Sequence, residues 1–298
     1  MIGRKLGNSC SRENVGALLS IFAPRNLSLL LLSFALLFVN WGLEVRKWSL
    51  ITGETEKISF GKAWQSVWTG VCIGNLTPGR LGEFAGRILF FSPAVRARIA
   101  TSHFVCGITQ LVITVVIGCL GLVFFSSGLN QLTWLIALAT ETILLVTLTL
   151  VLLRINPVIT WIITRGWLKK FNFEGLAYSR ALLLKLIGLS LIRYLVFSFQ
   201  FFLLLKACGI EGDIIHLGAA ISIMYLLLST IPMISMVEVA VRAYVAVLLF
   251  GMFHPNDWQL TAASTLLWLI NIVVPSLIGY VFILKNNFTF SAKKNGMA

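Results

Sequence analysis

Long runs of apolar residues that lack charge dominate the sequence and predict membrane-spanning helices. A spanning helix needs about 20 mostly apolar residues. A mixed segment at 154–180 carries too many charged residues to span. The runs predict about five full spans in an all-α polytopic membrane protein, near residues 26–43, 102–125, 131–153, 181–206 and 258–283.

Two further apolar stretches, 63–91 and 219–250, contain a proline and lack the pattern of simple spans. Proline removes a backbone donor and disfavours continued helix. In each stretch an apolar arm precedes the break, and a second apolar arm opens with a glutamate that is followed by an arginine four residues later. The pattern predicts two half-helices in each stretch, folded as a re-entrant hairpin.

The two breaks share a sequence pattern. In each, proline is followed five or six residues later by E-x-A-x-R, which begins at Glu83 in the first break and at Glu238 in the second. Discontinuous helices related by an internal repeat mark the substrate site in many transporters. The shared pattern therefore predicts an internal repeat whose two breaks contribute to one site.

Composition agrees with a membrane protein and excludes a water-soluble one. The chain is 58% hydrophobic and 12% charged, whereas about 25% of a soluble domain is charged. The net charge of +13 comes from scattered lysines and arginines, which argues against a nucleic-acid partner. The predicted domains are an N-terminal cytosolic or interfacial tail (1–24), a single transmembrane domain (25–284) and a basic cytoplasmic tail (285–298).

Basic residues also predict orientation, because cytoplasmic loops carry an excess of lysine and arginine. Basic residues flank both ends of the first broken stretch, so both ends are expected in the cytoplasm: Arg46, Lys47, Lys57, Lys62, Arg96 and Arg98. The second broken stretch is expected to enter from the outer face, which makes the two hairpins an inverted repeat. This topology places the basic N-terminal tail outside. Either the tail is an exception, or residues 16–23 insert, or a further helix precedes the first span.

The first break is the most informative string for chemistry. A half-helix that starts near Gly79 directs unpaired N–H groups at the break, where an anion can bind. Arginine offers a planar fork that suits a phosphate, and Arg80 is expected to be free for such a ligand. Glu83 and Arg87 lie four residues apart and form either an internal ion pair or part of the ligand site. The candidate lipid-binding residues are Thr77, Pro78, Gly79, Arg80, Gly82, Glu83 and Arg87.

The second break adds Pro232, Glu238 and Arg242 to the candidate lipid-binding residues. It lacks an equivalent of Arg80, so an internal ion pair between Glu238 and Arg242 competes more strongly with a ligand role.

Charged and amide side chains also occur inside the predicted spans. A carboxylate such as Glu141 must be protonated or paired in a membrane, and Arg193 is the candidate partner. The two residues form either a proton-coupling site or a structural ion pair. Gln110, Gln200 and Asn271 are expected to hydrogen-bond between helices.

Signatures of catalysis are absent from the sequence. It has no phosphate-binding loop, no nucleophile elbow and no metal-binding histidine motif. Aspartate occurs only at Asp213 and Asp257, so a carboxylate metal site is hard to build. We expect no enzyme activity, no cofactor, no metal and no catalytic residues.

The string T-P-G-R-L-G-E-x-x-G-R at 77–87 resembles the lysylphosphatidylglycerol synthase transmembrane domain family, a flippase-like family. N-W-G-L-E-V-R-K-W at 40–48 and I-P-M-I-S-M-V-E at 231–238 are similar to two further motifs of that family. At the second proline motif, 235–237 replace the glycine-rich part found in members. Members usually have one more helix before the first span, which would account for the orientation of the tail.

The resemblance covers roughly residues 25–283 and implies lipid movement between leaflets, with Arg80, Glu83, Arg87 and Glu238 at matching motif positions. The family's aminoacyl transferase is absent from this sequence. The resulting hypothesis is a translocase of the bacterial cytoplasmic (inner) membrane that moves an anionic or aminoacylated phospholipid or a polyprenyl-phosphate lipid. The alternative is a non-catalytic subunit that presents a lipid to a separate glycosyl- or aminoacyl-transferase. An integral-membrane enzyme is a third hypothesis.

Overall fold

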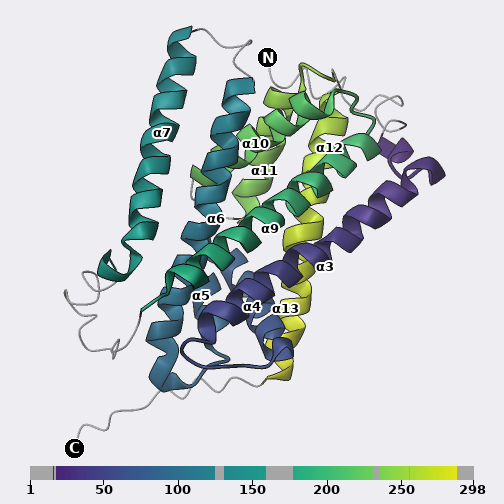
Figure 1. Ribbon diagram of the computed structural model, residues 1–298. Coiled ribbons are helices and arrows are strands. Elements are labelled where there is room, and N and C mark those ends of the chain that lie inside the picture. The colour runs from purple at the N-terminus through teal and green to yellow at the C-terminus, as the bar shows by residue number, and fades with distance from the viewer. Residues whose placement is uncertain are drawn as a thin grey trace, which may run out of the picture.

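The computed structural model describes residues 16, 18–124, 131–158, 177–230, 235–254 and 256–286, which form helices joined by short connections (Figure 1). None of these residues forms a strand. The α-helices are α3 (Pro24–Thr52), α4 (Phe60–Asn75), α5 (Gly82–Ile88), α6 (Arg96–Phe124), α7 (Gln131–Leu153), α9 (Arg180–Ala207), α10 (Ile214–Thr230), α11 (Ser235–Phe250), α12 (Asp257–Trp268) and α13 (Val274–Lys285). Short helical turns are η1 (Pro78–Arg80) and η2 (Pro93–Val95), and η5 (Leu269–Val273) is a π-helical segment.

Five helical stretches are long and apolar enough to cross a membrane, which confirms the all-α polytopic fold. They are α3, the η2–α6 stretch, α7, α9 and the continuous run from α12 through η5 to α13. The helix α3 has 29 residues and extends well past the apolar run at 26–43. It continues because Glu44 and Lys47 in its C-terminal half are buried and paired inside the protein.

The first broken stretch folds into two short arms, α4 and α5, that pack against one another through glycines. A Cβ on Gly86 of α5 would lie 2.8 Å from Cα of Gly70 on α4. A Cβ on Gly82 would lie 2.7 Å from the carbonyl oxygen of Ile73. Both contacts require glycine, so Gly82 and Gly86 allow the two arms to pack closely.

The second broken stretch consists of α10 and α11, which pack against one another (Figure 1). The connecting residues 231–234, and with them Pro232, lie outside the described residues. The helix α10 also packs closely on α6, where a Cβ on Gly118 would meet the side chain of Leu226. The re-entrant entry of both hairpins and their inverted relationship remain predictions.

Two clusters of buried apolar residues hold the helices together. One joins α9 and α10 to α11, α12 and part of α6, and the other joins α3 and α4 to α6 and α9. The helices α3 and α9 run side by side across the molecule (Figure 1). Ile21, in the predicted N-terminal tail, is 2% exposed and belongs to the first cluster.

Candidate functional site

Two adjoining cavities of about 330 and 320 Å³ lie between the helices. The first is bordered by α3, η1, α6, α9, α10, α11 and η5, and the second by α3, η1, α5, α6, α9 and α10. Both are lined by Trp41, Arg80, Gln110 and Arg193. We call the two together the charged cavity, because most of the buried ion pairs described below border it.

Arg80 connects the two broken stretches. Its Nη2 lies 3.2 Å from Oε2 of Glu238, and Arg242 donates to Oε1 of the same carboxylate at 2.7 and 2.9 Å. The expectation that Arg80 is free for a ligand is therefore wrong, because a carboxylate from the other break already faces it. Glu238 and Arg242 do form the expected ion pair, but this pair also holds the first break against the second.

The backbone of the first break directs Arg80 into the charged cavity. Gly79 and Arg80 both have left-handed backbone conformations, with φ of 59° and 57°. This conformation suits glycine but costs a residue with a Cβ about 1–2 kcal/mol. Thr77 stabilises the break, since its Oγ1 donates to the carbonyl of Gly74 and accepts from the N–H of Gly82 at 2.7 Å. Strain at a non-glycine residue that lines a cavity is typical of a functional position.

Glu83 and Arg87 form the internal ion pair that their spacing allows. Arg87 also contacts α3. Its Nη1 lies 3.0 Å from Oε1 of Glu44, and its guanidinium stacks over the Trp48 ring at 5.1 Å from the ring centroid. Only 2% of the Arg87 side chain is exposed. Arg87 therefore holds α5 against α3, whereas the partly exposed Arg80 is better placed for a ligand.

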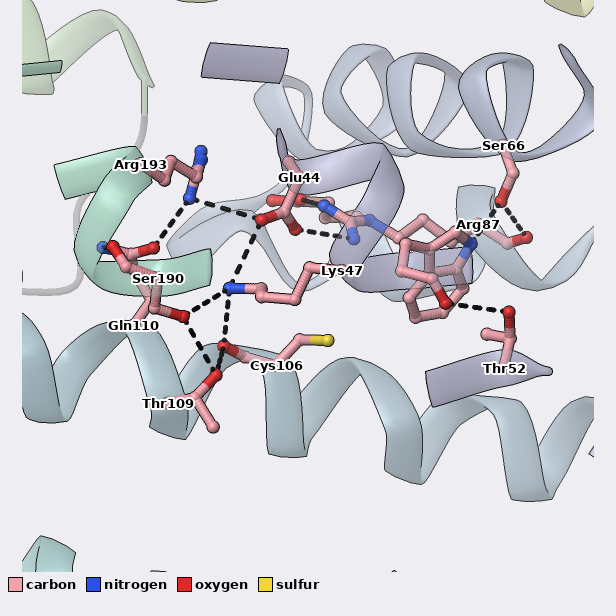
Figure 2. A network of polar contacts seen from close by, with 12 residues as sticks. Glu44, Lys47, Thr52, Ser66, Arg87, Cys106, Thr109, Gln110, Ser190 and Arg193 are labelled. Atoms are coloured by element: carbon pink, nitrogen blue, oxygen red, sulfur yellow. Dashed lines mark hydrogen bonds and ion pairs between the residues drawn. The ribbon is translucent and has the colours of Figure 1, made fainter. Parts of the chain in front are cut away.

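Glu44 is the centre of this network, and sequence reasoning missed it (Figure 2). Besides Arg87, its carboxylate lies 3.4 Å from both Lys47 Nζ and Arg193 Nη1. Three cations from three helices thus surround one carboxylate. The available signal was the spacing W-x-x-E-x-x-K-W at 41–48, which places two charges and two tryptophans near one helix face.

Lys47 and Arg193 lie in surroundings that differ from those expected. Lys47 was predicted to mark a cytoplasmic end, but it is 1% exposed within α3 and donates to the carbonyl of Cys106 and the hydroxyl of Ser190. Arg193 was predicted to pair with Glu141, but it contacts Glu44 and donates to Gln110 at 3.3 Å (Figure 2). The side chain of Glu141, on α7, lies outside the described residues.

A chain of buried amides borders the charged cavity and joins α3, α9 and η5. Asn40 donates to Asn271 at 3.0 Å, Asn271 donates to Gln200 at 2.9 Å, and Gln200 donates to the carbonyl of Ser33 at 2.8 Å. The prediction that Gln110, Gln200 and Asn271 form interhelical hydrogen bonds is confirmed. Asn271 lies in the π-helical segment, and such segments often occur at functional sites.

The ionisable residues that line the charged cavity have an excess of positive charge. The cations are Lys47, Arg80, Arg87, Arg193 and Arg242, and the carboxylates are Glu44, Glu83 and Glu238. Five cations and three carboxylates leave two positive charges uncompensated. Among the described residues, no group of three histidine, cysteine or acidic side chains could hold a metal ion. An anion fits this balance better than a cation.

Five apolar spans, four of which border a polar, cationic cavity, define a multi-pass α-helical membrane protein with an internal anion-compatible site. The chain belongs to the family described as "lysylphosphatidylglycerol synthase TM region", whose model matches residues 8–279. No curated protein matches the sequence. Membership of this family indicates a membrane protein whose role concerns lipids.

Proposed function

We propose that this protein moves a phosphate-containing lipid between the leaflets of a bacterial cytoplasmic membrane, with the phosphate bound at Arg80 in the charged cavity. The candidate lipids are anionic or aminoacylated phospholipids and polyprenyl phosphates. The observation that carries the proposal is the contact of Arg80 with Glu238 inside a cavity with excess positive charge. A lipid headgroup crossing a membrane needs a polar path, and this cavity supplies one.

Arg80 is suited to exchange its partner for a phosphate. Its side chain is 30% exposed, and Glu238 remains paired with Arg242 when Arg80 leaves. The exchange replaces one charge-assisted contact by another, so its net cost is small. Arg193, 22% exposed, lines the same two cavities and supplies a second guanidinium. A phosphate between the two arginines would use part of the excess charge and would loosen the contact between the breaks.

A vesicle assay tests this proposal. Purified protein is reconstituted with a trace of fluorescent phosphatidylglycerol, and the rate at which inner-leaflet label becomes accessible to external dithionite is measured. We expect wild-type protein to speed this rate, Arg80→Gln to slow it at least about tenfold through the lost charge-assisted contact, and the exposed control Arg154→Gln to leave it unchanged. An unchanged rate for Arg80→Gln would show that Arg80 does not contribute to lipid movement. A lipid that is bound but never moved would favour a subunit that presents lipid to a transferase.

A further inference from the structure

The carboxylates of the charged cavity are already occupied by cations of the protein. Glu44 faces Lys47, Arg87 and Arg193, as described above. Glu83 pairs with Arg87, and Glu238 with Arg80 and Arg242. An ammonium group entering the cavity would meet an excess of two positive charges, and every carboxylate there already pairs with an arginine. Like-charge contact at short range is unfavourable, most of all where water is scarce.

Four residues that line the first cavity, Asn40, Trp41, Arg193 and Tyr194, each have a buried polar atom without a hydrogen-bond partner. Two of these atoms belong to consecutive residues of α3. One is the acceptor Oδ1 of Asn40, in a side chain 3% exposed, whose amide nitrogen already donates to Asn271. The other is the donor Nε1 of Trp41, in a side chain 4% exposed. A buried polar group without a partner costs about 1–3 kcal/mol in proteins, so both atoms favour a ligand that satisfies them.

A hydroxyl group satisfies both atoms, because it donates one hydrogen bond and accepts others. It can donate to Oδ1 of Asn40 and accept from Nε1 of Trp41. The neighbouring cations Arg80 and Arg193 suit a phosphate in the same cavity. An unpaired acceptor, an unpaired donor and excess positive charge are therefore combined in one space, whereas no carboxylate there is without an arginine.

We infer that the charged cavity selects a lipid whose phosphate ester carries an uncharged, hydroxyl-bearing headgroup, and that it rejects an aminoacylated, cationic headgroup. The inference narrows the substrate class of the proposed translocase and rests on that proposal only for the ligand being a lipid. Arg80, Arg193 and Arg242 determine the charge of the accepted headgroup. Asn40 and Trp41 determine its hydrogen bonding.

Retention of lipid in native mass spectrometry tests this selectivity without requiring transport. The purified protein is offered phosphatidylglycerol, lysyl-phosphatidylglycerol or phosphatidic acid, which has no headgroup hydroxyl. We expect phosphatidylglycerol to be retained at least about tenfold more than the lysyl lipid, because of the ammonium's repulsion. Arg242→Gln, which releases Oε1 of Glu238, should raise relative retention of the lysyl lipid, whereas the exposed Arg154→Gln should not.

Trp41→Phe tests the hydroxyl contact. It removes only the indole N–H and should lower retention of phosphatidylglycerol about two- to tenfold, the range of one lost hydrogen bond. Retention of phosphatidic acid should stay unchanged. Trp268→Phe is the matched control, because its Nε1 is also buried without a partner but it does not line the charged cavity.

The retention experiment and the vesicle assay distinguish failure of the inferred headgroup selectivity from failure of the proposed lipid movement. Equal or stronger retention of the lysyl lipid overturns the inferred selectivity and leaves lipid movement to be judged by the vesicle assay. Selective retention without movement in that assay supports the selectivity and overturns the translocase. Soluble glycerol phosphate is offered in competition with the lipids, and its retention in their place overturns the inference that the ligand is a lipid.

Discussion

Nη2 of Arg80 lies 3.2 Å from Oε2 of Glu238, and this contact joins residues that are 158 positions apart in the chain. Each residue belongs to one of the two proline-broken stretches. Arg242 holds the other oxygen of the same carboxylate. The two stretches with a common sequence pattern therefore share an ion-paired group of three residues at the charged cavity.

Replacements of Arg80 separate its backbone strain from its charge. Arg80→Gly and Arg80→Ala both remove the guanidinium, but only glycine adopts the left-handed conformation at φ of 57° without strain. We expect the glycine variant to be more stable than the alanine variant by about 1 kcal/mol, measured by thermal unfolding in detergent. An alanine variant of equal or greater stability would show that the backbone at this position is unstrained.

Replacing Glu44 should destabilise the protein strongly. Glu44→Gln leaves Lys47, Arg87 and Arg193 buried near one another without their shared carboxylate. Loss of one partner of a buried ion pair typically costs about 3–5 kcal/mol, which thermal unfolding should reveal. Glu54→Gln, at an exposed position after α3, is the control. If both variants unfold at the same temperature, the network contributes little to stability.

The contact between α4 and α5 depends on glycine at position 86. In Gly86→Ala the new methyl group would lie 2.8 Å from Cα of Gly70 and 2.9 Å from the carbonyl oxygen of Thr69, so backbone must move. We expect a loss of about 1–3 kcal/mol. Gly188→Ala, where a Cβ meets nothing within 4 Å, should be neutral or slightly stabilising. Similar unfolding temperatures for the two variants would contradict the close packing.

The amide chain should behave as a coupled unit. Asn271→Leu leaves the amide nitrogen of Asn40 and the amide oxygen of Gln200 without this partner, at a cost of about 1–3 kcal/mol each. Gln200→Leu breaks the same link from the other side. A double-mutant cycle should give an interaction energy of at least about 0.5 kcal/mol. Strict additivity would show that the contact between these two amides contributes no stability.

Much of the fold could be predicted from the sequence because hydrophobicity in a membrane is a strong constraint. The run at 131–153 coincides with α7, and the runs at 181–206 and 258–283 lie within a residue or two of the helices found. The predicted end of the first span, at residue 43, was too early, because α3 continues to Thr52. A helix that buries charged side chains against other helices need not end where the charged residues begin.

The candidate site was predicted in part, since motifs identify residues but not their partners. Arg80, Glu238 and Arg242 were all candidates, yet nothing in the sequence indicates that Arg80 contacts Glu238. Glu44 was missed because it lies close to Arg46 and Lys47 in the sequence. A group of charges after an apolar run is typical of the cytoplasmic end of a spanning helix. The packing of α3 alongside α9 buries Glu44 and Lys47, whereas Arg46 stays exposed (Figure 1).

The extent of label exposure in vesicles that each hold one protein molecule tests lipid movement most directly. Without protein, dithionite destroys only the fluorescent phosphatidylglycerol in the outer leaflet. We predict that wild-type protein exposes the inner-leaflet label as well, so that nearly all fluorescence is lost. Vesicles with Arg80→Gln should retain the inner label over the same time. Wild-type vesicles that keep their inner-leaflet fluorescence would contradict the translocase.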